Sequence, residues 1–543
     1  MLQHRQLRLE RAVGAVAELV SLLWRTRTFM PVRAHHADEY KMFHVTMNDL
    51  RFAIRQLLKK PGFIAVAMFT LAKPLLAQSE SALKSSGRPD FSQARQLIQK
   101  HMVKYSNPSI AVAVARRGEI LWEEGFGWAD RENRIPATEH TMYYMASVDK
   151  SFTTVALMIL RERNQLDLNR PINDYLGAGK LTSPAWNPAE ATVQRVANQM
   201  AGLTTFHLTK DLPIDETIQR YGVIFWPPGE RFDYSNLGYQ ILDEVVARVS
   251  GKSYSNFMRA EIFWPLGMTH ASVGIGPGLE KFVAQRYSTT RGLRPPVADR
   301  VYCSAHDLAR FGIFCLKAHL PDQNRILSDA AIDAMYDTTV STGSGKYSLG
   351  WWIDDDLFGY RGILAQGGTD AAQAWLRLIP SEDIVAVALA NHGMMSSVVV
   401  DEIVSALLPT FREQRGKADE KKALQNTNNT SVSTLAGTWK GIVKTYREDI
   451  PLTFSIAESG DVHAKLGSQL TTLLNDARFD KQRLRGRMLG DLGVEEDTAQ
   501  ERYHLEFYLY LRDGALKGAV VTAPYPNLPF WAELKKQSRE REQ

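Results

Sequence analysis

The hydrophobic positions between residues 80 and 410 predict strands at both ends of this region. Ile110–Ala115 and Ile120–Phe126 are strand-like apolar runs, and the turn-forming residues 116–119 between them suit a hairpin. Ala374–Ile379 and Ile384–Ala390 are two further runs of strand length, separated by a polar turn. An early and a late hairpin of this kind indicate one sheet in which the first and last strands meet.

A helix is expected between the two hairpins. Ser151–Arg161 is apolar on all sides and is longer than an ordinary buried strand, so it favours a buried helix. Strands at both ends with helices between them predict a mixed α/β domain over about residues 79–412.

The pattern changes after residue 412. Residues 413–433 are polar and charged, which is typical of a linker, here with helical character at its start. Residues 434–543 contain short β-type runs, and in the last of them Leu505, Phe507, Leu509 and Leu511 alternate with polar or amphipathic residues. Such alternation is typical of half-buried strands and predicts a small C-terminal barrel or sandwich.

Residues 1–78 form a basic extension outside the expected globular core. The apolar run Phe63–Ala72 follows Arg55, Lys59 and Lys60, as in a signal peptide, and is too short to span a bilayer. The segment predicts an exported protein that is either periplasmic or membrane-anchored. Membrane association through residues 55–78 is expected, whereas cleavage and oligomeric state are left open by the sequence.

The composition of the chain argues against several classes of function. The chain has 543 residues, 44% hydrophobic and 23% charged, which suits a folded globular protein. Its net charge is +5, but the sequence contains no stripe of basic residues interleaved with aromatic residues. Nucleic-acid binding is therefore not expected. Cys303 and Cys315 are too few for a disulfide framework and are interpreted as buried apolar residues. No metal or cofactor is expected, because the cluster His35, His36 and Asp38 precedes the core.

Candidate chemistry begins at Ser147-Val148-Asp149-Lys150, directly before the expected buried helix. A lysine three residues after a serine lies on the same helical face and can take the proton of the hydroxyl. The helix N-terminus also points backbone N–H groups at a developing oxyanion. The Ser-x-x-Lys spacing alone is weak evidence for a catalytic serine, because the chain contains a second copy, Ser81-Ala82-Leu83-Lys84, that no apolar helix follows.

Further motifs around Ser147 resemble the serine β-lactamase and penicillin-binding-protein superfamily, in the branch of class C β-lactamases, D-aminopeptidases and esterases. Tyr234-Ser235-Asn236 resembles the Tyr-x-Asn motif of this superfamily, and the segments 107–153, 304–311 and 348–352 also fit its pattern. The resemblance covers roughly residues 85–410. It implies an antiparallel sheet flanked by helices, an α/β fold of the α+β type, followed by the small β-barrel domain.

The third motif of the superfamily has Lys or His, any residue, then Gly, and its match here is Gln366-Gly367-Gly368. The resemblance implies that the N–H of Thr369 joins that of Ser147 in an oxyanion hole. Gln366 supplies a neutral amide where relatives supply a cation, so weaker attraction of a substrate carboxylate is expected. The segment Asn198-Gln199-Met200-Ala201 departs from the superfamily pattern as well.

The resemblance and the chemistry imply the same roles. Ser147 attacks a carbonyl, Lys150 takes or relays its proton, Tyr234 protonates the leaving group, and Asn236 orients Lys150 and the substrate. Gln366, Gly367, Gly368 and Thr369 complete the substrate-binding set. The predicted activity is hydrolysis, through an acyl-enzyme, of an ester, amide or D-amino-acid peptide bond in a small molecule or peptide.

Two alternatives are left open by the sequence. Gln366 and the altered segment around Gln199 also suit a binding or sensor protein that keeps the fold but has lost turnover. Met47–Ala72 resembles the N-terminus of macrolide-exporter-type ABC permeases, which allows a transport-accessory protein. No long transmembrane segments follow it, so we interpret it as a membrane-entry segment rather than as part of a transporter.

Overall fold

The computed structural model describes residues 89–206, 212–289, 291–343, 345–393, 395, 397–422, 435–480, 482–494, 503–523 and 527–537. Residues from Pro89 onward cluster into one unit. The predicted N-terminal extension, its permease-like segment Met47–Ala72, the second Ser-x-x-Lys copy at Ser81 and most of the predicted linker lie outside the described residues.

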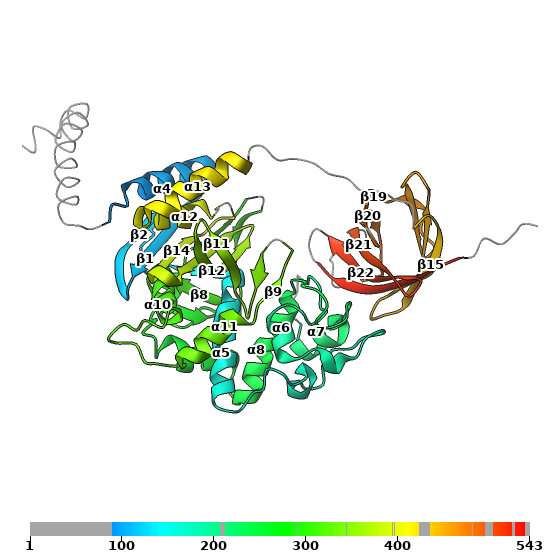
Figure 1. Ribbon diagram of the computed structural model, residues 1–543, viewed down its shortest axis with the longest axis horizontal. Helices are drawn as coiled ribbons and strands as arrows, with labels where there is room; N and C mark the ends of the chain where they lie inside the picture. The colour runs from blue at the N-terminus through cyan, green and yellow to red at the C-terminus, as the bar shows by residue number, and fades with distance from the viewer. Residues whose placement is uncertain are drawn as a thin grey trace, which may run out of the picture. The chain divides into compact units, whose positions relative to one another are not determined.

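A nine-stranded sheet forms the centre of the described region before residue 412, in the order β3-β2-β1-β14-β13-β12-β11-β10-β9 (Figure 1). All of its pairings are antiparallel, and β1 pairs with β14, so the predicted meeting of the early and late hairpins is confirmed. The strands are β1 Ser109–Arg116, β2 Glu119–Asp130, β3 Ile135–Pro136, β9 Val340–Ser341, β10 Lys346–Tyr347, β11 Trp352–Leu357, β12 Tyr360–Thr369, β13 Ala372–Ile379 and β14 Ile384–Ala390.

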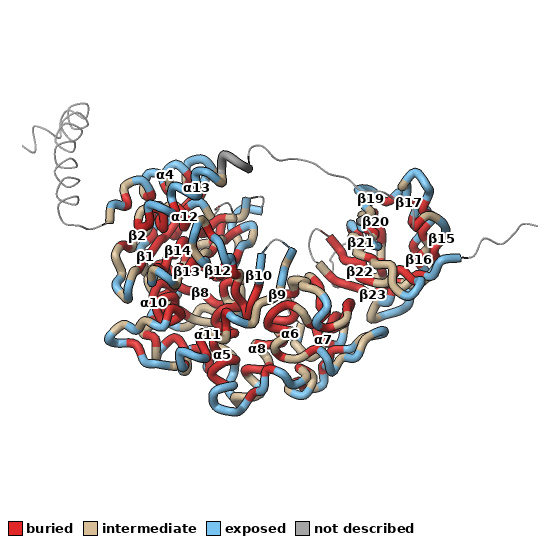
Figure 2. Tube along the Cα trace, viewed as in Figure 1, coloured by how far each residue is buried: buried red, intermediate tan, exposed pale blue. Residues whose placement is uncertain are grey.

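The neighbouring strands β1 and β14 are buried on both faces, which explains their unbroken apolar sequences (Figure 2). In β1 the large side chains Ile110, Val112 and Val114 enter one core, while alanines at the alternate positions enter the other. In β14 the small and large residues exchange places. Ala386, Ala388 and Ala390 face the first core, whereas Val385, Val387 and Leu389 face the second. Small and large residues thus alternate between neighbouring strands and fill each layer.

Helices cover both faces of the sheet. Figure 1 shows α4, α12 and α13 together on one side, and their apolar residues share a core with that face of β1. The core of the other face contains α5, α8 and α10. The helices are α4 Ser92–Tyr105, α5 Asp149–Glu162, α6 Val193–Ala197, α7 Ile214–Tyr221, α8 Asn236–Ser250, α9 Tyr254–Met258, α10 Ala305–Cys315, α11 Asp329–Asp337, α12 Val398–Leu407 and α13 Pro409–Lys422.

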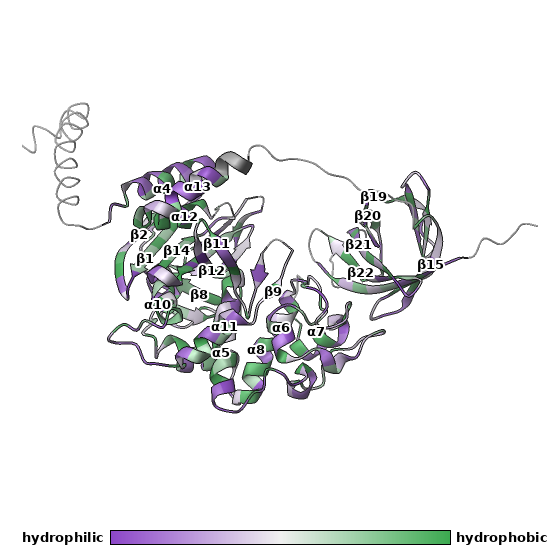
Figure 3. Ribbon diagram, viewed as in Figure 1, coloured by the Kyte–Doolittle hydropathy of each residue, from purple (hydrophilic) through white to green (hydrophobic). Residues whose placement is uncertain are grey.

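Two local predictions are confirmed. Every residue of α5 from Lys150 to Leu160 is buried, as the apolar run predicted, and both cysteines are buried and free. Helix α13 is largely hydrophilic (Figure 3) and continues to Lys422, within the first half of the predicted linker 413–433. Among the described residues, none of the helices combines the length and apolar character needed to cross a bilayer.

The C-terminal region is a second nine-stranded antiparallel sheet that is nearly closed, and the predicted barrel is therefore confirmed. Its inward residues alternate with outward ones, as in β16, where every second residue from Ile450 is buried. The strands are β15 Gly437–Lys444, β16 Asp449–Ile456, β17 Val462–Leu466, β18 Thr472–Leu473, β19 Asn475–Asp480, β20 Arg483–Gly490, β21 Tyr503–Arg512, β22 Ala515–Ala523 and β23 Pro529–Lys536.

Candidate active site

Ser147 lies in a short 3₁₀ turn, Ala146–Val148, that leads directly into α5. The turn is held from behind, because the Met145 N–H donates to the Val301 carbonyl at 2.9 Å. Ala146 has a φ of 46°, a left-handed conformation that costs a residue with a Cβ about 1 kcal/mol or more. Strain at this position is the kind of backbone feature that accumulates next to reacting groups.

Lys150 connects the nucleophile turn to α8. Its Nζ donates to Ser147 Oγ at 3.0 Å and to Asn236 Oδ1 at 2.9 Å, and the side chain is buried. Asn236 is the first residue of α8, and its Nδ2 donates to the Phe206 carbonyl at 3.5 Å, which points Oδ1 at the lysine. The structure therefore brings Asn236 to the Ser147–Lys150 pair, although 86 positions separate it from Lys150 in the sequence.

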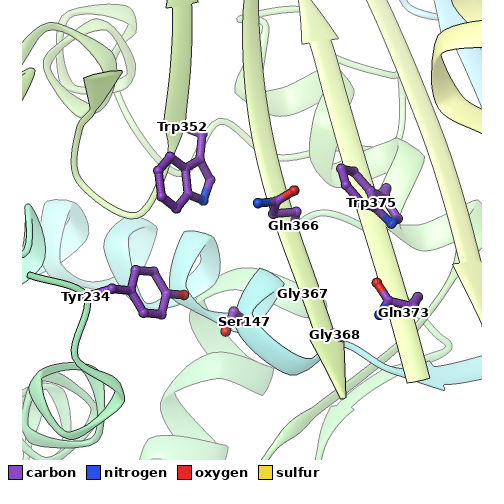
Figure 4. A pocket seen from close by; sticks show the side chains of 8 residues that line it. All are labelled: Ser147, Tyr234, Trp352, Gln366, Gly367, Gly368, Gln373 and Trp375. Atoms are coloured by element: carbon purple, nitrogen blue, oxygen red, sulfur yellow. The ribbon is translucent and has the colours of Figure 1, made fainter. Parts of the chain in front are cut away.

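Aromatic side chains surround the predicted acid Tyr234. The Trp352 ring stacks on it with centroids 6.2 Å apart, and Tyr347 meets it edge-on at the same distance. Lys150 Nζ lies 4.9 Å from the centre of the Tyr234 ring, within range of a cation–π interaction. Figure 4 shows the Tyr234 hydroxyl directed toward Ser147.

Gln199 holds the Tyr234-Ser235-Asn236 turn in place. Its Oε1 accepts from the Ser235 N–H at 2.9 Å, and its Nε2 donates to the Ser235 carbonyl at 3.3 Å. Both bonds are buried, so the amide satisfies the backbone N–H and carbonyl of Ser235, which water cannot reach. In the sequence, the altered segment around Gln199 suits a protein that has lost turnover, but the structure shows Gln199 supporting the Tyr-x-Asn motif. Nothing in the sequence pattern distinguishes these two roles.

The glycines of the third motif bring β12 against the nucleophile. A Cβ added to Gly367 would lie 2.4 Å from the Met145 carbonyl oxygen and 2.5 Å from the Ser147 nitrogen. At Gly368 an added Cβ would meet the amide of Gln373, whose Nε2 donates to the Gly393 carbonyl. Thr369 is the last residue of β12, and its place as the second oxyanion donor stays a prediction.

A cavity of about 380 Å³ opens at this point, and the described residues that line it carry no charge. Trp352 and Trp375 stand on either side of Gln366, as Figure 4 shows. The Trp375 Nε1 is buried and has no hydrogen-bond partner among the described residues. The full lining is Ser147, Tyr234, Trp352, Gln366, Gly367, Gly368, Gln373 and Trp375.

A charged cluster lies behind the start of α5. Arg300 is 4.0 Å from the Asp149 carboxylate and 3.7 Å from that of Asp243. Burial raises the pKa of Asp243 to about 7, and repulsion by Asp149 adds to this, while Arg300 and a hydrogen bond from Thr153 oppose it. Arg300 therefore interacts with two carboxylates, that of Asp149 at the start of α5 and that of Asp243 in α8.

The C-terminal barrel contacts the loop that precedes Tyr234. The Arg231 guanidinium lies 4.0 Å from the ring centre of Trp226 and 4.6 Å from that of Tyr510 on β21. Asp233 accepts from Trp226 Nε1 at 2.8 Å and from Arg231 Nη2 at 2.9 Å. Burial raises the pKa of Asp233, against the attraction of Arg231. A stacked and hydrogen-bonded unit therefore lies immediately before the predicted catalytic tyrosine.

Replacing Tyr510 with alanine should lower kcat/KM by about threefold to tenfold, because Arg231 loses one of the two rings that hold it. The melting temperature should fall by a few degrees, as expected for a loss of about 1–2 kcal/mol at a contact between packed elements. Steady-state kinetics and thermal unfolding measure both effects. Leu489→Ala, at an exposed barrel position, is the matched control. A lower melting temperature with unchanged kcat/KM would show that the contact does not position Tyr234.

Comparisons with known proteins agree with this geometry. The family model described as Beta-lactamase matches residues 94–405. Protein flp of Staphylococcus aureus (strain N315) is 23% identical over 334 residues, which are 58% of this chain and 65% of that protein. The putative penicillin-binding protein PbpX of Bacillus subtilis (strain 168) is 24% identical over 314 residues, 54% of this chain and 72% of that protein.

Solved structures share the fold. The octameric penicillin-binding protein homologue from Pyrococcus abyssi aligns with a TM-score of 0.53 and 21% identity, covering 82% of this chain and all of that one. A class C β-lactamase aligns with a TM-score of 0.51 and 18% identity, covering 59% of this chain and 96% of its own. Since the family match spans more than half of the sequence, the chain belongs to the β-lactamase family, whose members are serine hydrolases.

Proposed function

We propose that this protein hydrolyses an ester, amide or D-amino-acid peptide bond through an acyl-enzyme on Ser147. The observation that carries the proposal is the position of Lys150 Nζ, 3.0 Å from Ser147 Oγ and 2.9 Å from Asn236 Oδ1. A buried amine between a serine hydroxyl and an orienting amide is the arrangement needed to remove the hydroxyl proton during attack.

The remaining steps follow from the surrounding groups. Ser147 Oγ attacks the carbonyl carbon while its proton passes to Lys150, and the oxyanion forms beside the Ser147 N–H, against which β12 is packed. Tyr234 donates a proton to the leaving group, which departs and leaves the acyl group on Ser147. Water then attacks the acyl-enzyme and gives one proton to the Tyr234 phenolate, the acid product leaves, and Lys150 returns its proton to Ser147 Oγ.

The uncharged cavity supports a neutral acyl group as the preferred substrate. Gln366 and Gln373 offer amides, Trp352 and Trp375 offer apolar faces, and the described lining contains no cation. A substrate carboxylate would lose hydration there without gaining an ion pair. We therefore expect esters or amides with neutral, apolar acyl groups to be better substrates than β-lactams, which carry a carboxylate.

The test is covalent labelling of the full chain with a fluorophosphonate, followed by mass spectrometry of the peptides. The label should lie on Ser147, while Ser81, which has the same spacing to a lysine, should stay unmodified. Turnover of a p-nitrophenyl ester should accompany labelling. An adduct on Ser147 without turnover would indicate the binding or sensor protein instead, and absence of any adduct in folded protein would remove both functions.

The substitution Gln366→Lys should shift selectivity toward carboxylate-bearing substrates by about tenfold, since a charge-assisted hydrogen bond becomes available in the cavity. The measurement is the ratio of kcat/KM for p-nitrophenyl hemisuccinate to that for p-nitrophenyl butyrate. Gln366→Glu is the control of opposite charge and should move the ratio in the other direction. Equal ratios in both variants would show that this side chain does not face the acyl group.

A further inference from the structure

A second cavity of about 250 Å³ lies beside the hairpin formed by β6 (Arg286–Ser288) and β7 (Gly292–Arg294). It shares no lining residue with the cavity at Ser147. Its walls combine the two arginines of this hairpin with apolar side chains that include Ile275, Val283 and Pro296. A pocket with cationic groups at one side and apolar walls at the other suits an amphipathic anion.

Arg286 is the most unusual of the lining residues. Only 8% of its surface is exposed, and its guanidinium lies 4.7 Å from the ring centre of Tyr144. Nη1 donates to the Pro295 carbonyl at 2.7 Å, whereas Nε is buried without a hydrogen-bond partner among the described residues. In the described part of the chain no carboxylate forms an ion pair with this guanidinium. A buried cation of this kind is stabilised when an anion binds beside it.

The remaining charged residues of the lining, Arg294 and Glu280, indicate which ligand charge the cavity favours. Arg294 is half-buried and has neither an ion pair nor a side-chain hydrogen bond with any other described residue. Glu280 is exposed and belongs to the same lining. Two guanidinium groups and one carboxylate leave a single positive charge, which matches a monoanion better than a dianion such as phosphate. The planar fork of arginine matches the two oxygens of a carboxylate.

We propose that this cavity binds a small monocarboxylate with an apolar body. The carboxylate lies against Arg286 and Arg294, and the apolar body contacts the side chains of Ile275, Val283 and Pro296. The site is separate from the acyl cavity, so binding does not depend on Ser147 or on the function proposed above.

The hairpin that carries the site also adjoins the candidate active site. Ser288 Oγ donates to Asp370 Oδ2 at 2.6 Å, and Asp370 directly follows Thr369 at the end of β12. On the other side Arg286 stacks on Tyr144, three residues before Ser147. The occupant therefore contacts an element that packs against both segments carrying the predicted oxyanion donors.

The experiment measures binding of benzoate to the full chain carrying Ser147→Ala, by isothermal titration calorimetry. Benzamide is the neutral analogue of the same shape, and inorganic phosphate is the oxyanion without an apolar body. The variants are Arg286→Gln and Arg294→Gln, with Lys281→Gln as a matched control. Lys281 is exposed, lies beside Glu280 in the sequence, and is outside the lining, so its loss removes the same charge from the same surface.

The expected result is saturable binding of benzoate, none of benzamide, and weaker binding of phosphate than of benzoate. Arg294→Gln should weaken benzoate binding about tenfold, and Lys281→Gln should leave it unchanged. Arg286→Gln should abolish it; because that residue is buried, Arg294→Gln decides the matter if the Arg286 variant unfolds. The proposal is overturned by absence of saturable benzoate binding, by equal binding of benzamide, by phosphate binding as tightly as benzoate, or by unchanged affinity in Arg294→Gln.

Discussion

Replacing Lys150 with methionine should lower kcat/KM for a p-nitrophenyl ester by about 10³-fold, equivalent to about 4 kcal/mol of transition-state stabilisation. Lys150 Nζ is the group within hydrogen-bond distance of Ser147 Oγ that can accept its proton, and methionine fills a similar volume without a nitrogen. KM should change little, because the cavity lining does not include this side chain. Steady-state kinetics over a range of substrate concentrations separates the two constants.

The same substitution should leave the melting temperature unchanged or raise it. Lys150 is only 4% exposed, and the nearby carboxylates of Asp149 and Asp243 are within ion-pair distance of Arg300. Burial of an amine takes it out of water at a cost in free energy, so an apolar replacement removes a cost of folding. Lys100→Met, on the exposed surface of α4, is the control for replacing a lysine with methionine. Near-normal kcat/KM in Lys150→Met would refute the assignment of Lys150 as the base.

The substitution Gly367→Ala should reduce kcat by about 10²- to 10³-fold. Its new methyl group would lie between 2.4 and 2.9 Å from three backbone atoms of the nucleophile turn, the Met145 oxygen and the nitrogens of Ser147 and Val148. Backbone cannot move aside as a flexible side chain can, so β12 and the turn must separate. Loss of one oxyanion donor, or a displacement of about 1 Å, has an effect of this size.

Gly345→Ala is the matched control, because an added Cβ there has no neighbour closer than 3.9 Å. It should retain wild-type kinetics. Circular dichroism and thermal unfolding establish that Gly367→Ala is folded at the assay temperature. Folded Gly367→Ala with wild-type kcat would show that the approach of β12 to Ser147 is not needed for catalysis.

The elements that the sequence predicted correctly are those with strong local patterns. The apolar runs of β1 and β14 and the apolar residues on all sides of α5 predict burial, and the alternation in β21 predicts a barrel strand. The Ser147–Lys150 spacing is also local, because one helical turn brings the two side chains together.

The features that the sequence did not reveal depend on contacts between distant residues. Gln199 supports Ser235 through two hydrogen bonds across 36 positions. The sequence around an amide side chain does not indicate which distant residue it will bond. Trp375 on β13 resembles a core residue in sequence, yet it lines the cavity because its strand lies beside Gln366. The stacking of Arg231 on Tyr510 joins two domains, and no periodicity of either segment indicates it.

The pairing of β1 with β14 has a consequence for how the protein is made. Ser109 donates to the side chain of Asn391, 282 residues further along the chain, so one edge of β1 has no partner until that part has been translated. During this interval the ribosome carries a nascent chain whose Ile110, Val112 and Val114 are exposed to the cytoplasm together with unpaired backbone groups. Synthesis of this protein should therefore depend on chaperones that bind nascent chains, and a ribosome that stalls before codon 384 should release an aggregating fragment rather than a folded one.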